Sequence, residues 1–196
     1  TVMGATYGAA KFANAIAVKV VNRFGMGTIS ECIDGMEWTY NDFQTKDEAA
    51  GGQFKAVVSM SLGYSRSSAM DSVVQEMSDI GLLVVAAAGN SRTSACTFSP
   101  SGAPASISVA ASDQPDRLAS FTNYGVCVDV IAPGVNILSA GHQGEDDTAT
   151  MSGTSMACPL AAGVVLRYLS QVEDRPSPEA IRAWMAETST KDAIDL

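Results

Sequence analysis

Short apolar runs alternate with amphipathic stretches along most of the chain. Each run is bounded by glycine or polar residues and is too continuously apolar for one face to meet water. Runs of this kind predict strands that are covered on both faces. The runs are AIAVKVV (15–21), KAVVSMSLG (55–63), LLVVAAAGN (82–90), SISVAAS (106–112) and CVDVIAPG (127–134).

Helical spacing of apolar residues fills the intervals between these runs. It predicts helices over 28–42, over 68–80 after a serine cap at 67 or 68, and from Thr154 to about 171. A last helix is expected after the cap Ser177. Strands that alternate with helices indicate an α/β fold: a doubly wound, mostly parallel sheet with helices on both faces, built as one domain over 1–196.

Composition and charge exclude some classes of partner. Apolar residues make up 46 % of the 196 residues and charged residues 17 %, which suits a well-buried globular domain. The net charge of −9 argues against binding to a nucleic-acid backbone. No run approaches the roughly 18 apolar residues of a membrane span, so we expect neither nucleic acid nor membrane as a partner.

The four cysteines, Cys32, Cys96, Cys127 and Cys158, include no C-x-x-C pair, which disfavours a zinc site. Cys96 and Cys127 lie in loop-like surroundings, so from spacing alone a disulfide between them is an open alternative. Cys32 and Cys158 fall within helical patterns, where a small buried apolar residue is the simpler interpretation. Cys158 also lies one turn beyond Ser155, near a helix N-terminus that lowers a thiol pKa, so a chemical role stays open.

Three polar motifs follow buried segments and carry the candidate chemistry. Ser155, in TMSGTSMACPLAAG, is placed in the first turn of a helix, where free N–H groups and the helix dipole favour negative charge. Asn90 ends a buried strand and would direct its amide at the same point, forming an oxyanion hole. The strand end SLG (61–63) offers an edge to which a peptide can add. Carboxyl ends of parallel strands meet at one edge of a sheet, so we expect the three motifs to converge.

These motifs resemble those of a known enzyme family. GTSMACP, VAAAGN and SMSLG look like the serine, oxyanion-asparagine and substrate-strand motifs of the subtilisin-like serine proteases (subtilases), in the proteinase K branch. The resemblance extends over essentially the whole chain, and TSTKDAI near its end is similar to the fungal cerevisin-type vacuolar or secreted proteases. It implies a three-layer α/β/α subtilisin-like fold and a serine endopeptidase activity.

The resemblance also assigns roles to individual positions. It implies that Ser155 is the nucleophile and that its N–H shares the oxyanion hole with Asn90. It implies a disulfide between Cys96 and Cys127 and a structural calcium site. The implied substrate-binding residues are Ser61, Leu62, Gly63, Gly25, Met26, Gly27, Ala87, Ala88 and Gly89, and the implied calcium ligands are the backbone oxygens of Pro104 and Ser106 with the Asp129 carboxylate.

The chain departs from the family pattern in front. Thr1 aligns with the residue just after the catalytic-histidine motif, so these 196 residues resemble the C-terminal two-thirds of a subtilase catalytic domain, with the N-terminal strands, the catalytic Asp and the catalytic His outside them. The one histidine, His142, stands in a loop ahead of Ser155 and does not match the catalytic one. A serine without a base is a poor nucleophile, so we expect the chain alone not to be an active protease.

Two interpretations of function remain. In the first, the chain is part of a serine endopeptidase that hydrolyses peptide bonds when a missing N-terminal segment or a second chain supplies Asp and His. In the second, it is a truncated pseudoprotease that serves as a binding or regulatory module, or is repurposed for isomerase-like or cyclase-like chemistry on a small molecule. The resemblance implies peptide or protein substrates, or an inhibitory propeptide, as partners, and a secreted or vacuolar location.

Overall fold

A computed structural model describes residues 1–144 and 146–194. Their helices and strands follow one another in the order α1 (Ile29–Ala49), β1 (Val57–Met60), β2 (Tyr64–Ser65), α2 (Ser68–Asp79), β3 (Leu83–Ala87), the 3₁₀ turn η1 (Ala95–Thr97), β4 (Phe98–Ser99), β5 (Ser106–Ser112), β6 (Val130–Pro133), β7 (Ile137–Ala140), β8 (Thr148–Met151), α3 (Thr154–Leu169) and α4 (Pro178–Thr188). None of the helices in the described part of the chain is both long and apolar enough to cross a membrane.

The central sheet has the order β1–β3–β5–β6, and all its pairs are parallel, with Val57 opposite Leu83 and Val84 opposite Ser106. Two short antiparallel pairs, β2–β4 and the hairpin β7–β8, stand outside it. In β3 and β5 every residue is buried, as their continuous apolar runs predict. The predicted α/β class is therefore confirmed.

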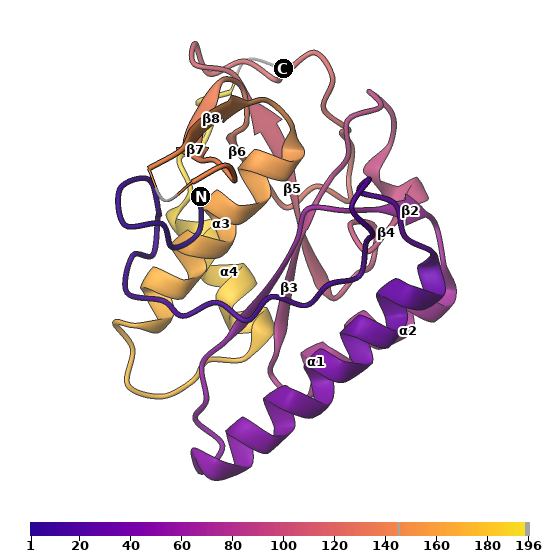
Figure 1. The fold of residues 1–196 in the computed structure, drawn as a ribbon, viewed down its shortest axis with the longest axis vertical. Helices are drawn as coiled ribbons and strands as arrows, with labels where there is room; N and C mark the ends of the chain where they lie inside the picture. Colours follow the sequence, from indigo (N-terminus) through magenta and orange to yellow (C-terminus); the bar gives the residue numbers. More distant parts are fainter. Residues whose placement is uncertain (145, 195–196) are drawn as a thin grey trace.

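Helices cover the two faces of the sheet and give three layers. On one face, Leu83 and Val85 pack with Ile107 beneath α3 and α4. On the other face, Leu82 and Val84 pack with residues of α1 and α2. Figure 1 shows α1 and α2 together on one side of the strands and α3 with α4 on the other.

Local signals set the helix ends as predicted. Thr28 and Glu31 form a capping box at the start of α1. The Ser67 hydroxyl accepts from Met70 N–H and caps α2, which ends just before Gly81 with φ of +86°. Ser177 caps α4, and Pro178 occupies its first turn.

One predicted strand is absent. Residues 15–21 form no strand among the described residues; Ile16 is 54 % exposed, and Val18 and Val20 are half-buried. The prediction of a buried strand there was wrong, because an apolar run becomes a buried strand only when neighbouring strands lie beside it. In the described structure the sheet ends at β1, and residues 1–28 pass from beside α3 across to the start of α1 (Figure 1).

Candidate active site

Ser155 is the second residue of α3 and lies at the carboxyl end of β1. Its hydroxyl donates to the Ser61 carbonyl oxygen at 3.3 Å, and the Ser61 hydroxyl donates back to the Ser155 carbonyl oxygen at 2.9 Å. This pair of hydrogen bonds joins the start of α3 to the segment after β1. The Ser155 hydroxyl thus contacts an acceptor but no group that titrates as a base near neutral pH.

Asn90 lies beside Ser155, as the sequence predicts. The Asn90 side-chain oxygen accepts from Thr154 N–H at 2.9 Å and from the Thr154 hydroxyl at 3.0 Å, which turns its amide nitrogen away from α3's first N–H. A methyl group placed on Gly153 would lie 3.5 Å from Asn90 Nδ2 and 3.7 Å from Ser155 N. The two candidate oxyanion donors therefore lie near one another at the N-terminus of α3, where the dipole favours negative charge.

Two residues that the sequence analysis did not single out hold this corner. Thr154 is fully buried, and its hydroxyl also accepts from Gly89 N–H at 3.1 Å. Asn123 is fully buried as well: it donates to the Ala88 carbonyl oxygen at 2.8 Å, and its side-chain oxygen accepts from Ser91 N–H at 3.0 Å. The GTS triplet was the available signal for Thr154, whereas nothing local marks Asn123.

The turn after β3 depends on glycine. Gly89 has φ of +103°, and a Cβ there would lie 2.4 Å from Asn123 Nδ2. Ala87 and Ala88 are buried, and Gly89 is half-buried between them and Asn90. The three predicted pocket-wall residues are therefore adjacent to the oxyanion corner.

The two predicted substrate-binding edges differ. Ser61, Leu62 and Gly63 extend beyond β1 and lie next to Ser155 through the Ser61 contacts. Met26 is different: its carbonyl oxygen accepts from Asn22 N–H at 2.8 Å and its N–H donates to the Asn22 side chain at 3.2 Å.

Gly25, with φ of +75°, closes this turn by donating to the Asn22 carbonyl oxygen. A Cβ on Gly27 would lie 2.3 Å from the Val20 carbonyl oxygen, so Gly27 also packs closely against its own segment. The Met26 backbone thus hydrogen-bonds within its own loop, and the assignment of residues 25–27 to substrate binding stays a prediction.

His142 lies at the tip of the β7–β8 hairpin and is exposed. Its N–H donates to the Asp147 carboxylate, which organises the tip. The four residues of β8 separate this tip from Ser152, a strand length of about 13 Å. That His142 does not act as the base for Ser155 stays a prediction.

Cys158 is fully buried beneath Ser155, and its sulfur contacts the Val85 carbonyl oxygen at 3.4 Å. Burial raises the pKa of the Cys158 thiol to about 11, and hydrogen bonds from Ser59 and Ser61 offset only part of this effect. The helix N-terminus does not activate this thiol, so the suggestion of a lowered pKa was wrong. Desolvation by burial is the largest cause of this rise in pKa.

The predicted disulfide is present. Cys96 and Cys127 are bonded, with their Cα atoms 5.3 Å apart, and Cys32 and Cys158 are free and buried. The bond lies behind the oxyanion corner: the Ala95 N–H donates to the Tyr124 carbonyl oxygen, and the Asn123 N–H donates to the Gly89 carbonyl oxygen. It therefore joins the two loops that position Asn90.

The predicted calcium ligands lie at the opposite end of the sheet, where β5 and β6 begin. The Ser106 carbonyl oxygen and the Asp129 carboxylate converge there, and Pro104 is exposed nearby in the chain. Arg182 of α4 contacts both of these oxygens: its guanidinium donates to the Ser106 carbonyl and pairs with Asp129 at 3.3 Å. The oxygen set therefore already holds a cationic side chain.

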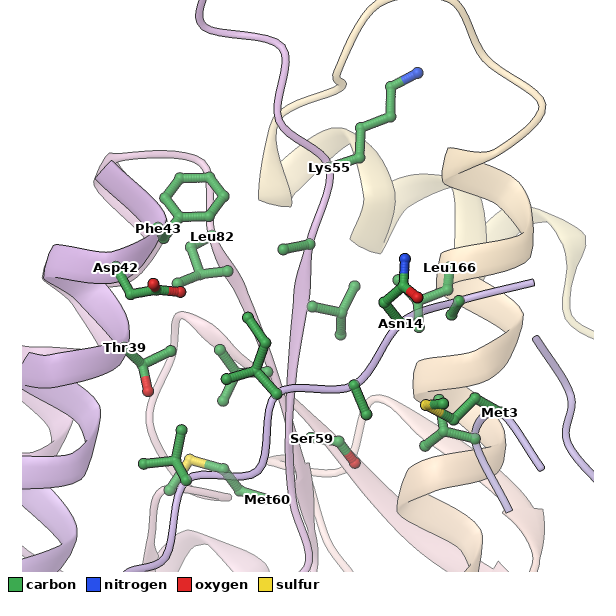
Figure 2. Close-up of a pocket in the computed structure, with 18 of the residues that line it drawn as sticks. Met3, Asn14, Thr39, Asp42, Phe43, Lys55, Ser59, Met60, Leu82 and Leu166 are labelled. Atoms are coloured by element: carbon green, nitrogen blue, oxygen red, sulfur yellow. The ribbon is translucent and has the colours of Figure 1, made fainter. Parts of the chain in front are cut away.

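A groove of about 710 Å³ lies along the outer edge of β1. Thr39, Asp42 and Phe43 of α1 line one side of it, Leu166 of α3 lines the other, and Ser59 and Met60 form its floor (Figure 2). Residues 14–20 cross over it. No backbone hydrogen bond joins 16–21 to 56–61 within the described residues, so the outer edge of β1 has no partner strand.

A parallel sheet between two helical layers, with a serine and an asparagine converging at a helix N-terminus, defines a subtilisin-like domain. The subtilase family model matches residues 2–195, and the chain belongs to that family. A crystal structure of a cold-adapted subtilisin-like serine proteinase superposes with a TM-score of 0.88 at 34 % identity, covering 99 % of this chain and 67 % of the other.

Fungal proteases are among the similar sequences. A cuticle-degrading serine protease of Arthrobotrys oligospora is 41 % identical over 92 % of this chain and 42 % of its own length. Cerevisin of Saccharomyces cerevisiae is 38 % identical over 99 % of this chain and 32 % of its own length. Alkaline protease 1 of Aspergillus flavus is 41 % identical over 99 % of this chain and 47 % of its own length. The chain spans less than half the length of these curated relatives.

Proposed function

We propose that this chain is the nucleophile-bearing part of a serine endopeptidase that hydrolyses peptide bonds. In this proposal Ser155 attacks the scissile carbonyl, and Asn90 and the Ser155 N–H stabilise the oxyanion. The observation that carries the proposal is that Asn90 Nδ2 and Ser155 N lie near one another, 3.5 Å and 3.7 Å from the position that a Cβ on Gly153 would take. An oxyanion hole of this kind contributes about 10²–10³ in rate per donor.

The Asp and His of the triad are assigned to a polypeptide segment outside the 196 residues. The only histidine of the sequence is at the hairpin tip, so the chain itself offers no imidazole at Ser155. Loss of a triad member costs about 10⁴–10⁶ in rate, which makes the chain by itself an inefficient protease.

The groove beside β1 is the proposed docking site for that segment, which would add as a strand to the unpaired edge. Six of the eleven exposed large apolar side chains among the described residues belong to the first 38 residues. Phe12, Ile16 and Trp38 are three of them and line the groove. An apolar strand with free N–H and C=O groups would cover these side chains and complete the hydrogen bonds of β1.

The disulfide supports a secreted or vacuolar location for the enzyme, since disulfides persist in oxidising compartments. Peptide or protein substrates and an inhibitory propeptide are the proposed partners at the Ser61–Gly63 edge.

Labelling of Ser155 by a fluorophosphonate tests this function. We expect the chain alone to be labelled as slowly as Ser155→Ala, and labelling to accelerate when the Asp- and His-bearing segment of the cold-adapted proteinase is co-refolded with it. Val18→Asp, which places a charge in the groove without entering the core, should weaken that acceleration. Brisk labelling of the chain alone, or no acceleration with the segment, would contradict the proposal.

The second candidate is a pseudoprotease that binds peptides or regulates a partner without cleaving them. The Met26–Asn22 pairing favours it, because a substrate edge occupied by its own loop cannot hold a substrate on both sides. Unaccelerated labelling together with peptide binding would favour this candidate. The burial of Cys158, which raises the pKa of its thiol, argues against a role for this thiol in isomerase-like or cyclase-like chemistry in the cleft.

A further inference from the structure

The predicted calcium ligands surround an arginine. Ser106 is the first residue of β5, and Asp129 immediately precedes β6, so both lie at the N-terminal edge of the parallel sheet, away from Ser155. Arg182 reaches this edge from α4. Its Nη2 donates to the Ser106 carbonyl oxygen, and its Nη1 lies 3.3 Å from one carboxylate oxygen of Asp129.

The second carboxylate oxygen of Asp129 is also occupied. It accepts from Ser108 N–H at 2.7 Å, and the Asp129 N–H donates to the Ser108 carbonyl oxygen at 3.0 Å. Burial raises the pKa of the Asp129 carboxyl, and the Ser108 N–H and the Arg182 charge act in the opposite direction. This carboxylate therefore has one cationic partner, Arg182, and one neutral hydrogen-bond donor, the Ser108 N–H.

Helix α4 fixes the position of the guanidinium. Ile181 and Met185, on either side of Arg182 in sequence, are buried in the core with 2 % and 7 % of their surface exposed. Trp184 stacks on Tyr168 of α3 with ring centroids 4.0 Å apart. Because the helix is anchored next to it, Arg182 is held over the two oxygens at little entropic cost.

These donors do not suit calcium while Arg182 is among them. Calcium takes 6–8 oxygen ligands at 2.3–2.6 Å. Here one of the three expected ligands accepts a guanidinium N–H and another pairs with it, and a +1 group already lies within van der Waals range of the space a divalent ion would fill.

We propose that the Arg182 guanidinium replaces the calcium ion that the resemblance implies, so that α4, β5 and β6 are joined by a cation belonging to the chain itself. The site is distinct from the proposed catalytic cleft and independent of its activity. Arg182 is a structural residue in this proposal, and the stability of this sheet edge does not respond to external calcium.

The experiment compares calcium binding by the wild-type chain and by Arg182→Met, measured by titration calorimetry and by the melting temperature. We expect the wild-type chain to bind no calcium at Asp129, so Asp129→Asn should leave the calcium titration of the wild type unchanged. Arg182→Met vacates both oxygens and should acquire a calcium-dependent rise in melting temperature of about 5–10 °C at a hundredfold excess over Kd. Adding Asp129→Asn to Arg182→Met should abolish this gain.

Arg167→Met is the matched control: it removes the same charge from α3, at an exposed position, and should gain no calcium response. If Arg182→Met folds poorly, refolding with and without calcium gives the same answer: recovery in calcium supports the proposal, and equal failure in both contradicts it. Calcium binding by the wild type that Asp129→Asn abolishes would overturn the proposal outright.

Discussion

The two walls of the cleft are built differently. On the α3 side, Thr154 holds Asn90, and Asn123 holds the turn around it, so that residues 32 to 64 positions apart fix one another. On the α1 side, residues 14–27 cross the groove without joining a strand, and Ile16 and Met26 are exposed. The α3 side of the cleft is thus held by hydrogen bonds among its own residues. The α1 side lies beside the unpaired edge of β1.

The largest expected difference between the walls is in core packing. Ile107 of β5 is 1 % exposed, and Ile107→Ala should lower the free energy of unfolding by about 2–5 kcal/mol. Ile16→Ala removes the same atoms from a side chain that is 54 % exposed, and should change it by less than about 0.5 kcal/mol. Urea unfolding measures both, and equal losses would show that residues 15–21 pack as a strand in solution.

The disulfide stabilises the α3 side of the cleft. Cys96→Ser with Cys127→Ser opens a link that spans 31 residues and should lower the free energy of unfolding by about 2–4 kcal/mol. Thiol titration of the denatured, unreduced wild type should find two free cysteines, Cys32 and Cys158. Four free thiols would rule the bond out.

The two free thiols make the free energy of unfolding dependent on pH. Burial raises the pKa of Cys32, which lines the groove, and of Cys158, beneath Ser155, from 9.0 to about 11. Because the folded state keeps these protons longer than the unfolded state, stability is full below pH 9 and falls as the pH rises from about 9 to 11. The loss is about 2–3 kcal/mol for Cys158 and smaller for Cys32, because solvent in the groove screens that thiol.

Unfolding at a series of pH values, with Cys32→Ala and Cys158→Ala as matched variants, measures this loss. The rates of alkylation of the two thiols in the native state compare the two sides of the cleft. Cys32, which lines the groove, should react before Cys158 of α3. The reverse order would mean that the α3 wall opens more readily than the groove.

The smallest expected effect is at the oxyanion corner. Thr154→Val keeps the shape of the side chain but leaves Gly89 N–H without its buried acceptor and leaves the Asn90 side-chain oxygen with only the Thr154 N–H as donor, which should cost about 1–3 kcal/mol. Thr154→Ser retains the hydroxyl and should cost much less. Chemical denaturation of the two variants separates these outcomes, and equal losses would argue that the hydrogen bonds contribute nothing.

Sequence patterns predicted the central strands and the helix starts correctly. The runs at 82–90 and 106–112 became β3 and β5, and the caps Ser67 and Ser177 begin α2 and α4, because each signal depends on neighbours within the chain. The run at 15–21 is also mostly apolar, but no adjacent strand lies beside it, so its apolar pattern alone gave a wrong prediction.

The candidate site divides along the same line. Ser155, Asn90 and Ser61 meet because Ser61 follows β1, Asn90 follows β3 and Ser155 begins α3 at the same edge of the sheet. The family resemblance also pointed to the Cys96–Cys127 bond that the structure contains. Asn123 and Arg182 were missed, because a hydrogen bond to Ala88 or to Ser106 across 35 or 76 residues leaves no trace in local spacing. The hydrogen bonds between Met26 and Asn22 were not predicted, because the sequence does not show when a loop's own hydrogen bonds compete with those to a ligand.

The unpaired edge of β1 also affects how readily copies of the chain aggregate. Two copies that meet edge to edge would satisfy each other's free N–H and C=O groups, so dispersion of the chain relies on mutual repulsion. The net charge of −9 supplies that repulsion at neutral pH, and acid, which neutralises the carboxylates, or salt, which shortens its range, removes it. A strand seated in the groove would cap the edge and make dispersion far less sensitive to the medium.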